Sequence, residues 1–272
     1  MSANTNITEK KYRKLSIQVS LNGFRFCCFD TLNQVVLFVK EVDFNDFEKS
    51  IKVEDHYWQA FVNHRELTTT YDEVVVIHEN NLSAFVPKAL FDENYLGSYL
   101  QYSTKVFESD FFAFDALEPF DMVNVYIPYV NFNNYLLDQF DSFEYLHVNS
   151  ILVAKLLESS KNVSETQLFV HVGKEHFEII VIENQKLLLF NSFEYQTKVD
   201  FIYYILFTAE QLKLNPESLK LQLLGEISEE SDLFKIAYRY IRNVSLMNVF
   251  HTQKHNDFST AENLKYFILF NS

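Results

Sequence analysis

The stretch LFVHVGKEHFEIIVIENQKLLLFNSFEY, residues 168–195, decides the fold of this chain. Its apolar residues first alternate with polar ones and then form longer runs, which predicts three strands joined by two tight turns. The single glycine of the stretch, Gly173, falls where the first strand should end. Because hairpin turns that contain glycine can hold a phosphate, this turn is a candidate binding site.

The same pattern occurs earlier in the chain, in LSIQVSLNGFRFCCFDTLNQVVLF, residues 15–38. This stretch aligns with residues 168–191 without a gap, and apolar positions of one copy coincide with apolar positions of the other. Each copy is followed by a helical pattern, an apolar strand and a second helical pattern. After the first copy these lie at residues 46–62, 73–79 and 85–101, and after the second copy at residues 200–214, 219–227 and 231–243. Six matching elements in the same order predict an internal duplication, in which each half is β-β-β-α-β-α.

The first half contains additional elements. Periodicity predicts two further strands there, at residues 122–130 and 143–149, and two further helices, at residues 131–140 and 150–160. Near the other end of the chain, STAENLKYFILFN, residues 259–271, predicts a closing helix with Ser259 or Thr260 as its N-cap.

The boundary between the halves is expected in the polar run ESSKNVSETQ, residues 158–167, because this run breaks both periodicities. The predicted organisation is therefore a flexible N-terminal tail at residues 1–14, a first lobe at residues 15–160 and a second lobe at residues 161–272.

Composition and charge exclude several classes of partner. The 272 residues are 48% apolar and carry a net charge of −14, which disfavours binding to nucleic acid or to an anionic membrane. The longest strongly apolar run, FIYYILFTA at residues 201–209, is too short to span a bilayer. Cys27 and Cys28 are adjacent on a predicted strand and point to opposite faces, so we expect reduced thiols in the core of a cytoplasmic protein. The expected partner is another protein, without membrane insertion.

Aromatic residues, with 28 Phe and 16 Tyr, are unusually frequent. They are densest in residues 107–130, and two interpretations of this stretch remain open. It either forms part of the core of the first half or exposes an aromatic patch that binds a partner. The single tryptophan, Trp58, lies at helical spacing with Phe61 and Val62, which predicts a core position.

Three antiparallel strands followed by helix, strand and helix, twice over, resemble the actin-like ATPase superfamily, also called the ribonuclease-H-like fold. More narrowly, residues 15–30 and 168–195 are similar to an uncharacterised bacterial family, domain of unknown function 3822, over nearly the whole chain. The resemblance implies a duplicated α/β fold with two lobes and a cleft between them. In active members the nucleotide lies in that cleft, where the first hairpin of each half presents an Asp followed by Gly and Ser or Thr to Mg²⁺ and phosphate.

In the first half, Gln18 stands where the resemblance implies the aspartate. Glutamine cannot carry the charge that holds Mg²⁺. The implied Gly-Thr pair falls on Ser20 and Leu21, and the only glycine of the hairpin, Gly23, comes later.

In the second half, His171 stands at the position of the aspartate, and histidine is a poor ligand for so hard a cation. Gly173 is kept, but Lys174, Glu175 and His176 follow it in place of the small residues of the family motif. Glu175 would repel phosphates from the turn, where Lys174 is the one available phosphate partner.

The third motif of the superfamily, a pair of glycines after a later strand, is replaced here by Gly225 and Glu226. The chain has only 4 glycines, against about 7% in an average protein. Phosphate cradles need glycine where the backbone approaches the ligand, so this composition argues against one.

Two groups of residues are of metal-ligand type. His251 and His255 are four residues apart, but Thr252 replaces the glutamate of the metalloprotease signature. The members of the second group lie on a strand and a turn and need not converge: His171, Glu175, His176 and Glu178. We therefore expect no metal site.

These observations favour a non-catalytic relative of the actin-like ATPases, a pseudo-ATPase that acts as a cytoplasmic scaffold or protein-binding module without a cofactor. Its degenerate cleft positions are Gln18, Ser20, Gly23, His171, Gly173, Lys174 and Gly225. The alternative is a nucleotide-binding enzyme, an ATPase or kinase, whose altered phosphate site uses Lys174, Glu175 or His171.

Overall fold

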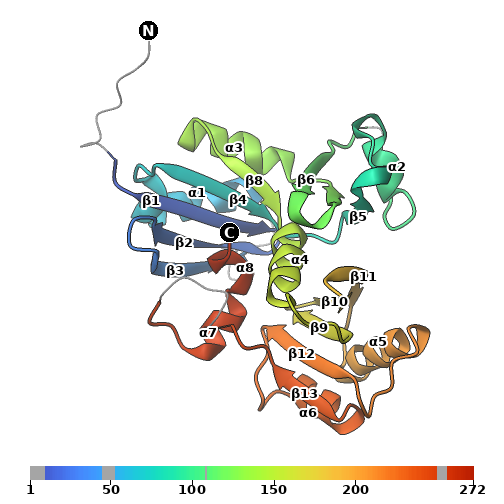
Figure 1. Cartoon of the computed structure of the whole chain (residues 1–272). Coiled ribbons are helices and arrows are strands. Elements are labelled where there is room, and N and C mark those ends of the chain that lie inside the picture. Colours follow the sequence, from blue (N-terminus) through green and yellow to red (C-terminus); the bar gives the residue numbers. More distant parts are fainter. Residues whose placement is uncertain (1–9, 45–52, 108, 250–255) are drawn as a thin grey trace. The chain divides into compact units, whose positions relative to one another are not determined.

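A computed structural model describes residues 10–44, 53–107, 109–249 and 256–272. These residues divide into two compact units. Lobe 1 holds the described residues up to Ile151 together with Asn256 and Ser272, and lobe 2 holds those from Leu152 onward apart from these two. Each lobe combines a five-stranded sheet with helices (Figure 1).

The sheet of lobe 1 has the strand order β3-β2-β1-β4-β8. Its strands are β1 (Arg13–Ser20), β2 (Gly23–Asp30), β3 (Val35–Asp43), β4 (Glu73–His78) and β8 (Glu144–His147). The first three are antiparallel, whereas β4 is parallel to β1 and β8 is parallel to β4. A return to parallel pairing requires a crossover connection, which the intervening chain supplies.

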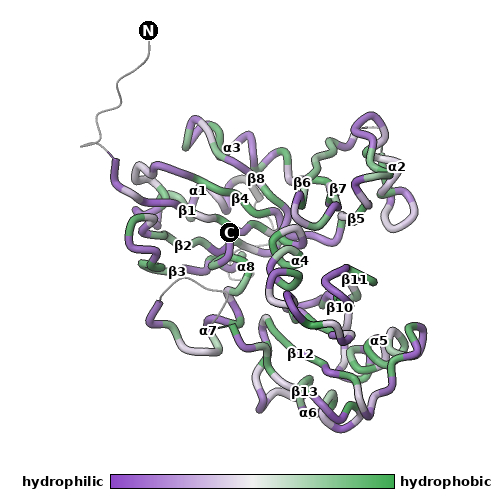
Figure 2. The backbone as a smooth tube through the Cα atoms, viewed as in Figure 1, coloured by the Kyte–Doolittle hydropathy of each residue, from purple (hydrophilic) through white to green (hydrophobic). Residues whose placement is uncertain are grey.

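Two helices supply the apolar cover of this sheet. Helices α1 (Val53–Asn63) and α3 (Val130–Phe140) bring Tyr57, Phe61 and Phe132 into one core with alternate residues of β1, such as Ile17 and Val19. Alternation along β1 therefore places one set of side chains in this core, as the period of a strand requires. Figure 2 shows hydrophobic residues concentrated along the strands.

A second, smaller sheet is inserted in lobe 1 between β4 and β8. Its strands are β5 (Ser83–Pro87), β6 (Ala113–Leu117) and β7 (Met122–Tyr126), and β7 lies in the middle. Between β5 and β6 lies the short helix α2 (Leu96–Leu100), and the lobe also contains the 3-10 turns η3 (Arg65–Thr68), η4 (Lys88–Leu90), η5 (Glu93–Tyr95) and η6 (Glu118–Phe120).

The single helix predicted over residues 85–101 is wrong. Its first residues belong to β5, which ends at Pro87, and only residues 96–100 form an α-helix. A short apolar run fits either period, and here pairing with β7 decides for a strand. Pro87 lacks the N–H that a continuing ladder or helix would use.

The sheet of lobe 2 has the order β11-β10-β9-β12-β13, with the same strand directions as in lobe 1. Its strands are β9 (Gln167–Val172), β10 (His176–Glu183), β11 (Lys186–Glu194), β12 (Lys220–Gly225) and β13 (Asn243–Leu246). The helices are α4 (Val148–Ser159), which begins in lobe 1, α5 (Lys198–Gln211), α6 (Asp232–Tyr240), α7 (Thr260–Lys265) and α8 (Phe267–Phe270). β13 was not predicted, because its residues fall at and beyond the end of the helical pattern of residues 231–243.

Helices α5 and α6 cover one face of this sheet (Figure 1). Phe201 and Ile205 of α5 and Ala237 of α6 are fully buried in one cluster with strand residues. Helix α5 starts with a capping box formed by Thr197 and Asp200. Helix α7 likewise has a capping box, in which Ser259 is the N-cap and Thr260 lies in the first turn.

The two sheets share a local irregularity. Register between β2 and β3 shifts between Cys28 and Phe29, which leaves Leu37 as an extra residue on β3. Register between β10 and β11 shifts between Val181 and Ile182, which leaves Leu188 as an extra residue on β11. Both leucines are β-bulges on an edge strand and are about half exposed, at 44% and 49%.

Burial corrects one prediction and settles another. Trp58, predicted in the core, is 59% exposed, although Phe61 one turn later is buried. The aromatic stretch of residues 107–130 is divided, because Tyr126 is fully buried whereas Phe107 and Phe111 are each 53% exposed. Cys27 and Cys28 are both buried, as predicted. Within the described ranges, no helix is long and apolar enough to cross a membrane.

Candidate functional site

The β1–β2 hairpin of lobe 1 is closed by its own polar groups. Ser20 Oγ donates a hydrogen bond to Gly23 O at 3.0 Å and accepts one from Asn22 N at 3.3 Å. The Tyr57 hydroxyl donates to Ser20 O at 3.0 Å. Gln18 is buried, and its Nε2 donates to Glu79 Oε2 at 2.9 Å. The structure thus brings Ser20 and Gly23 together and directs Gln18 toward β4.

A row of polar side chains crosses the first three strands of lobe 1. Strand register pairs Gln18 with Arg25 and Arg25 with Glu41, so the three lie on one face of the sheet. Arg25 Nε lies 3.3 Å from Glu41 Oε1, and their side chains are only 14% and 23% exposed. A partly buried guanidinium at the centre of this row therefore has a carboxylate beside it.

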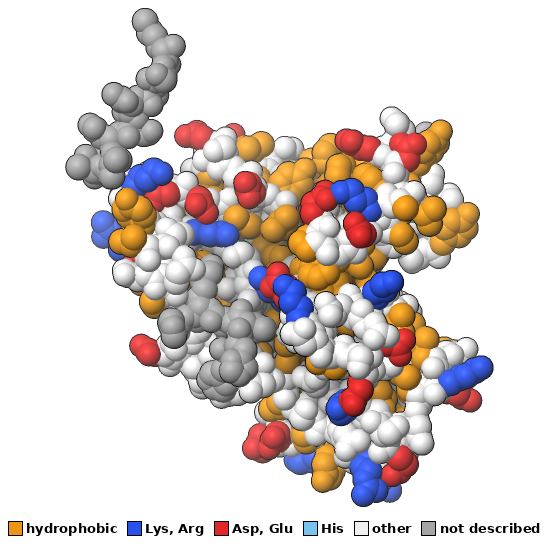
Figure 3. Space-filling model, viewed as in Figure 1, with side chains coloured by type: hydrophobic (Ala, Val, Ile, Leu, Met, Phe, Trp, Pro, Cys, Tyr) orange, Lys and Arg blue, Asp and Glu red, His pale blue; other side chains and the backbone are white. Residues whose placement is uncertain are grey.

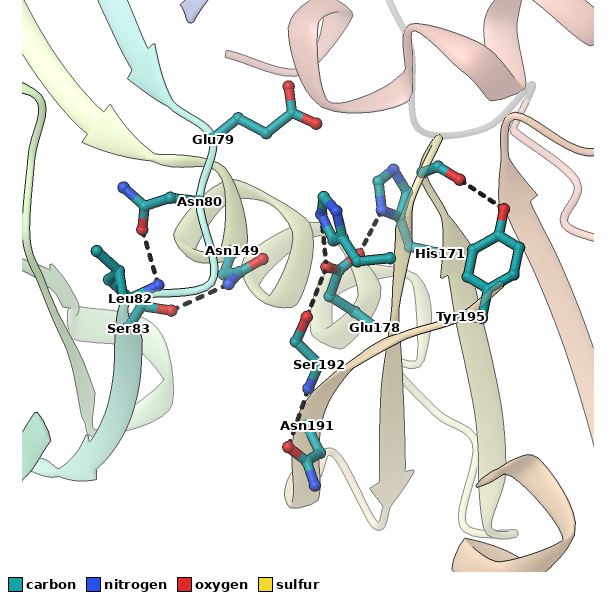
Figure 4. Close-up of polar contacts among 12 residues, drawn as sticks. Glu79, Asn80, Leu82, Ser83, Asn149, His171, Glu178, Asn191, Ser192 and Tyr195 are labelled. Atoms are coloured by element: carbon teal, nitrogen blue, oxygen red, sulfur yellow. Dashed lines mark hydrogen bonds and ion pairs between the residues drawn. The ribbon is translucent and has the colours of Figure 1, made fainter. Parts of the chain in front are cut away.

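Lobe 2 has a row at the same register positions, formed by His171, Glu178 and Ser192. His171 Nδ1 donates to Glu178 Oε2 at 2.8 Å, and Ser192 Oγ donates to Glu178 Oε1 at 3.3 Å (Figure 4). His176 Nε2 lies 3.2 Å from the same Oε1. His171, His176 and Glu178 therefore do converge, whereas Glu175 is exposed in the turn.

Glu178 is a buried carboxylate that stays charged. Burial by itself raises the pKa of this carboxyl, but the hydrogen bond from His171, the charges of His176 and His171 and the hydrogen bond from Ser192 outweigh it. The net result is a pKa below the ordinary value of a glutamate. This row therefore has an anion at its centre, where the row of lobe 1 has a cation.

The turn after β9, where the superfamily binds phosphate, is closed by protein groups. Gly173 N donates to His176 O at 2.9 Å, which is the hydrogen bond of the hairpin itself. The Tyr195 hydroxyl donates to Gly173 O at 3.0 Å, and Tyr195 N donates to Glu175 O at 3.2 Å. Lys174 and Glu175 are exposed at the tip. The N–H of Gly173 is thus already used by the fold.

Two predicted site glycines have a structural reason. Gly225 has φ +92°, and a Cβ there would lie 2.3 Å from Val172 O. Gly23 has φ +149°, and its Cβ would lie 2.2 Å from Val42 O. In both cases the backbone of the neighbouring strand passes where a side chain would be, so only glycine fits. Gly225 lies beside the end of β9, next to His171 and Gly173 in the same lobe.

Lobe 1 also contains a buried polar network that the sequence did not reveal. Asp115 of β6 accepts hydrogen bonds from the Tyr126 hydroxyl at 3.0 Å, from His147 N at 2.8 Å and from the Ser150 hydroxyl. Burial raises the pKa of the Asp115 carboxyl, and these hydrogen bonds oppose the rise. The network ties the inserted sheet to the start of α4.

Two buried histidines extend the network to the ends of β4 and β8. Burial lowers the pKa of His78 to about 4 and, together with the nearby His78, lowers the pKa of His147 to about 3. His147 Nδ1 accepts from Asn149 N at 3.1 Å, and its Nε2 lies 3.2 Å from Asn80 Oδ1. The only sequence signal was that polar residues follow apolar strands at residues 78–80 and 147–149.

The chemistry open to these groups is limited. In the row of lobe 2, Ser192 Oγ donates to the Glu178 carboxylate, whose pKa lies below the ordinary value of a glutamate, so this carboxylate is only a weak base for activating the hydroxyl as a nucleophile. Among the described residues, no group of three or more His, Cys, Asp or Glu side chains is arranged to hold a metal ion. His251 and His255 lie outside the described residues.

Known structures share this architecture. A Bacteroides thetaiotaomicron protein with an actin-like ATPase fold and unknown function is 24% identical, with 90% of this chain and 95% of that chain covered and a TM-score of 0.78. PilM in the PilM–PilN type IV pilus biogenesis complex is 11% identical over 94% and 96% of the two chains, with a TM-score of 0.58. The cytoplasmic domain of EpsL, an inner membrane component of the type II secretion system of Vibrio cholerae, is 15% identical over 96% and 95%, with a TM-score of 0.50.

These likenesses confirm the predicted actin-like ATPase fold with two α/β lobes. No curated protein matches the chain. Residues 2–244 match the family described as "Protein of unknown function (DUF3822)". The chain therefore belongs to the DUF3822 family, as its two hairpins indicated.

Proposed function

We propose that this chain is a non-catalytic member of the actin-like ATPase fold, built from a duplicated unit, that serves in the cytoplasm as a scaffold or protein-binding module. One observation carries the proposal. At both positions where the superfamily has its aspartate, a different side chain is hydrogen-bonded inside its own lobe, Gln18 to Glu79 and His171 to Glu178.

The electrostatics of lobe 2 support the same conclusion. A nucleotide triphosphate at the turn after β9 would approach Glu178, whose carboxylate is buried and charged, and Glu175 at the tip. Repulsion between like charges is strongest where water is excluded. The amide of Gly173, which could otherwise bind a phosphate oxygen, is engaged with His176 O.

A binding role is supported by analogy with neighbours of the same fold. PilM is found in a complex with PilN, and EpsL is a component of a secretion system. At their level of identity the likeness concerns the fold, so the role is carried over only as a proposal. Cys27 and Cys28 are buried and are not joined in a disulfide, in keeping with a reducing compartment.

The proposed duplication is supported by register. In each lobe the second strand has its shift at the same place, between Cys28 and Phe29 and between Val181 and Ile182. The sheet orders β3-β2-β1-β4-β8 and β11-β10-β9-β12-β13 correspond strand by strand. β-Bulges tend to persist within a family, so a shared bulge favours a common ancestor of the lobes.

Thermal unfolding with and without Mg-ATP tests the proposal. A site with a Kd about a hundredfold below the ATP concentration would add about 2.7 kcal/mol of stability. We expect no shift of Tm with Mg-ATP relative to Mg²⁺ alone, and no release of phosphate over time. A clear Tm shift together with phosphate release would overturn the proposal and favour the alternative, an enzyme with an altered phosphate site.

A further inference from the structure

A groove of about 860 Å³ lies in the insertion of lobe 1, between the η5–α2 segment, residues 93–100, and the described residues that follow, 101–107 and 109–112. We call it the α2 groove. The residues that matter for the argument are Glu93, Tyr95, Lys105, Phe107, Asp110 and Phe111. Figure 3 shows hydrophobic side chains at the surface over this part of the lobe, with acidic side chains nearby.

The groove exposes aromatic side chains. Tyr95 is 61% exposed, and Phe107 and Phe111 are each 53% exposed. A few residues later in the same aromatic stretch, Tyr126 is completely buried. The insertion has an apolar core of its own, formed around Val86, Leu100, Val123 and Val125, and these three rings are not part of it. Aromatic side chains in such a position are typical of the centre of a binding surface.

Local hydrogen bonds hold the two phenylalanines in place. Phe107 N donates to Asp110 Oδ2 at 2.8 Å, and Asp110 N donates to Phe107 O at 3.1 Å, so these two residues are linked directly before Phe111. Lys105 Nζ lies 5.0 Å from the centre of the Phe107 ring, within the range of a cation–π contact. These contacts fix the backbone beside the aromatic lining and hold one cation against the Phe107 ring.

The charges along the groove define what it can bind. Its lining contains the carboxylates of Glu93 and Asp110 and one ammonium group, that of Lys105, which lies over an aromatic ring. The chain as a whole carries a net charge of −14. An occupant that presents Lys or Arg beside apolar anchors would be complementary, whereas a second copy of this acidic chain or an anionic membrane would be repelled.

We propose that the α2 groove binds a short segment of a partner protein that combines aromatic or aliphatic anchors with flanking Lys or Arg residues. The groove volume is that of a site for a few side chains rather than for a whole protein face. The inference rests on the proposed binding function and specifies its site and the chemistry of the partner. The anchors fill the space between the aromatic rings, and the basic residues face Glu93 and Asp110.

Selection from a random library of short peptides displayed on phage tests this inference. The wild-type chain should enrich peptides that carry aromatic or aliphatic residues next to Lys or Arg. Their binding should weaken at least about tenfold in the double variant Phe107→Ser/Phe111→Ser. Glu93→Lys should weaken them several-fold. The matched control is Tyr203→Ser/Phe207→Ser on α5, which removes two rings that are 58% and 45% exposed in lobe 2 and should leave binding unchanged.

Unchanged Tm values for the serine variants would show that the fold is intact. The inference is overturned if no peptide is enriched, if the enriched peptides are acidic, or if they bind the Phe107→Ser/Phe111→Ser variant as well as the wild type. It is also overturned if wild-type chains self-associate and this variant does not, since a second copy would then be the occupant. These results are independent of the Mg-ATP measurement. A wrong inference about peptide binding in the α2 groove can therefore be distinguished from a wrong proposed function.

Discussion

The hairpins β1–β2–β3 and β9–β10–β11 have the same backbone and different chemistry. Two backbone hydrogen bonds of lobe 1 recur at equivalent register positions in lobe 2. The bond from Glu79 N to Val19 O, 2.8 Å, corresponds to the bond from Glu226 N to Val172 O, 2.7 Å. The bond from Phe44 N to Asn22 O, 2.9 Å, corresponds to the bond from Tyr195 N to Glu175 O, 3.2 Å. In lobe 1 the central polar residue is Arg25, and in lobe 2 it is Glu178. The two lobes thus share the strand pairing that sets the position of the polar row, but the residues in the row carry opposite charges.

This difference is informative because both rows are satisfied within their lobes. Arg25 is paired with Glu41, and Glu178 is hydrogen-bonded to His171 and Ser192. A buried ion that has partners is tolerated, whereas one without them is costly. Each lobe therefore has its own internal partners at the positions where the resemblance to the superfamily implies ligand-binding side chains.

The largest expected effect is a loss of stability of lobe 1 in mild acid. His78 and His147 have pKa values lowered to about 4 and about 3, so they stay neutral in the folded lobe while an unfolded chain takes up protons below about pH 6.5. The unfolded state then binds more protons, and stability falls as pH falls. From about pH 7 to about pH 5 the two histidines together should cost about 4 kcal/mol.

Hydrogen exchange resolved by peptide would measure this loss lobe by lobe. Amides of β4 and β8 should lose protection toward pH 5, and those of β9 and β10 should lose much less, because His171 in lobe 2 lies against a carboxylate. A His78→Asn variant should keep about half of the pH dependence of lobe 1. Equal pH dependence in the two lobes would contradict the assignment.

The second effect concerns a position where the lobes differ. Gly225 pairs with Val172 as His78 pairs with Val19, so glycine stands in one lobe where histidine stands in the other. Gly225→Ala should lower the free energy of unfolding by about 3 kcal/mol, because its Cβ would collide with the Val172 backbone at a positive φ. Urea unfolding followed by circular dichroism measures this cost. Gly173→Ala is the matched control and should cost about 1 kcal/mol or less, and equal costs at both positions would count against the collision.

The smallest effect compares the two polar rows directly. Glu178→Gln removes a fully buried charge that two histidines contact, and it should cost about 2 kcal/mol in urea unfolding at neutral pH. Glu41→Gln removes the partner of Arg25 at a more exposed place and should cost about 1 kcal/mol or less. If Glu41→Gln proved the more damaging change, the row of lobe 1, and not that of lobe 2, would be the tighter network.

The hairpins were predictable because strand alternation is a local property of the sequence. Residues 15–38 and 168–191 revealed both three-stranded units and the likeness of the halves. The inserted sheet was harder, because β5 and β6 are five residues each and a short apolar run can serve a strand or a helix. Trp58 has helical spacing with Phe61, but only Phe61 packs in the core, whereas Trp58 and Val62 are exposed to solvent.

The site was predictable only in part. The positions of Gln18 and His171 follow from the alignment of the halves, but their partners Glu79 and Glu178 follow from strand pairing, which the sequence does not state. Asp115 and its partners are far apart in the chain and meet only when the insertion folds against α4. Long-range polar pairs of this kind leave no periodic signal.

The leucine bulges of β3 and β11 have a consequence for how copies of this chain behave at high concentration. An edge strand with an irregular step offers no even row of donors and acceptors, so an incoming strand would lose its register at Leu37 or Leu188. Growth of a continuous intermolecular sheet is therefore interrupted at this edge of each five-stranded sheet. A chain so rich in phenylalanine thereby gains protection against fibrous aggregation.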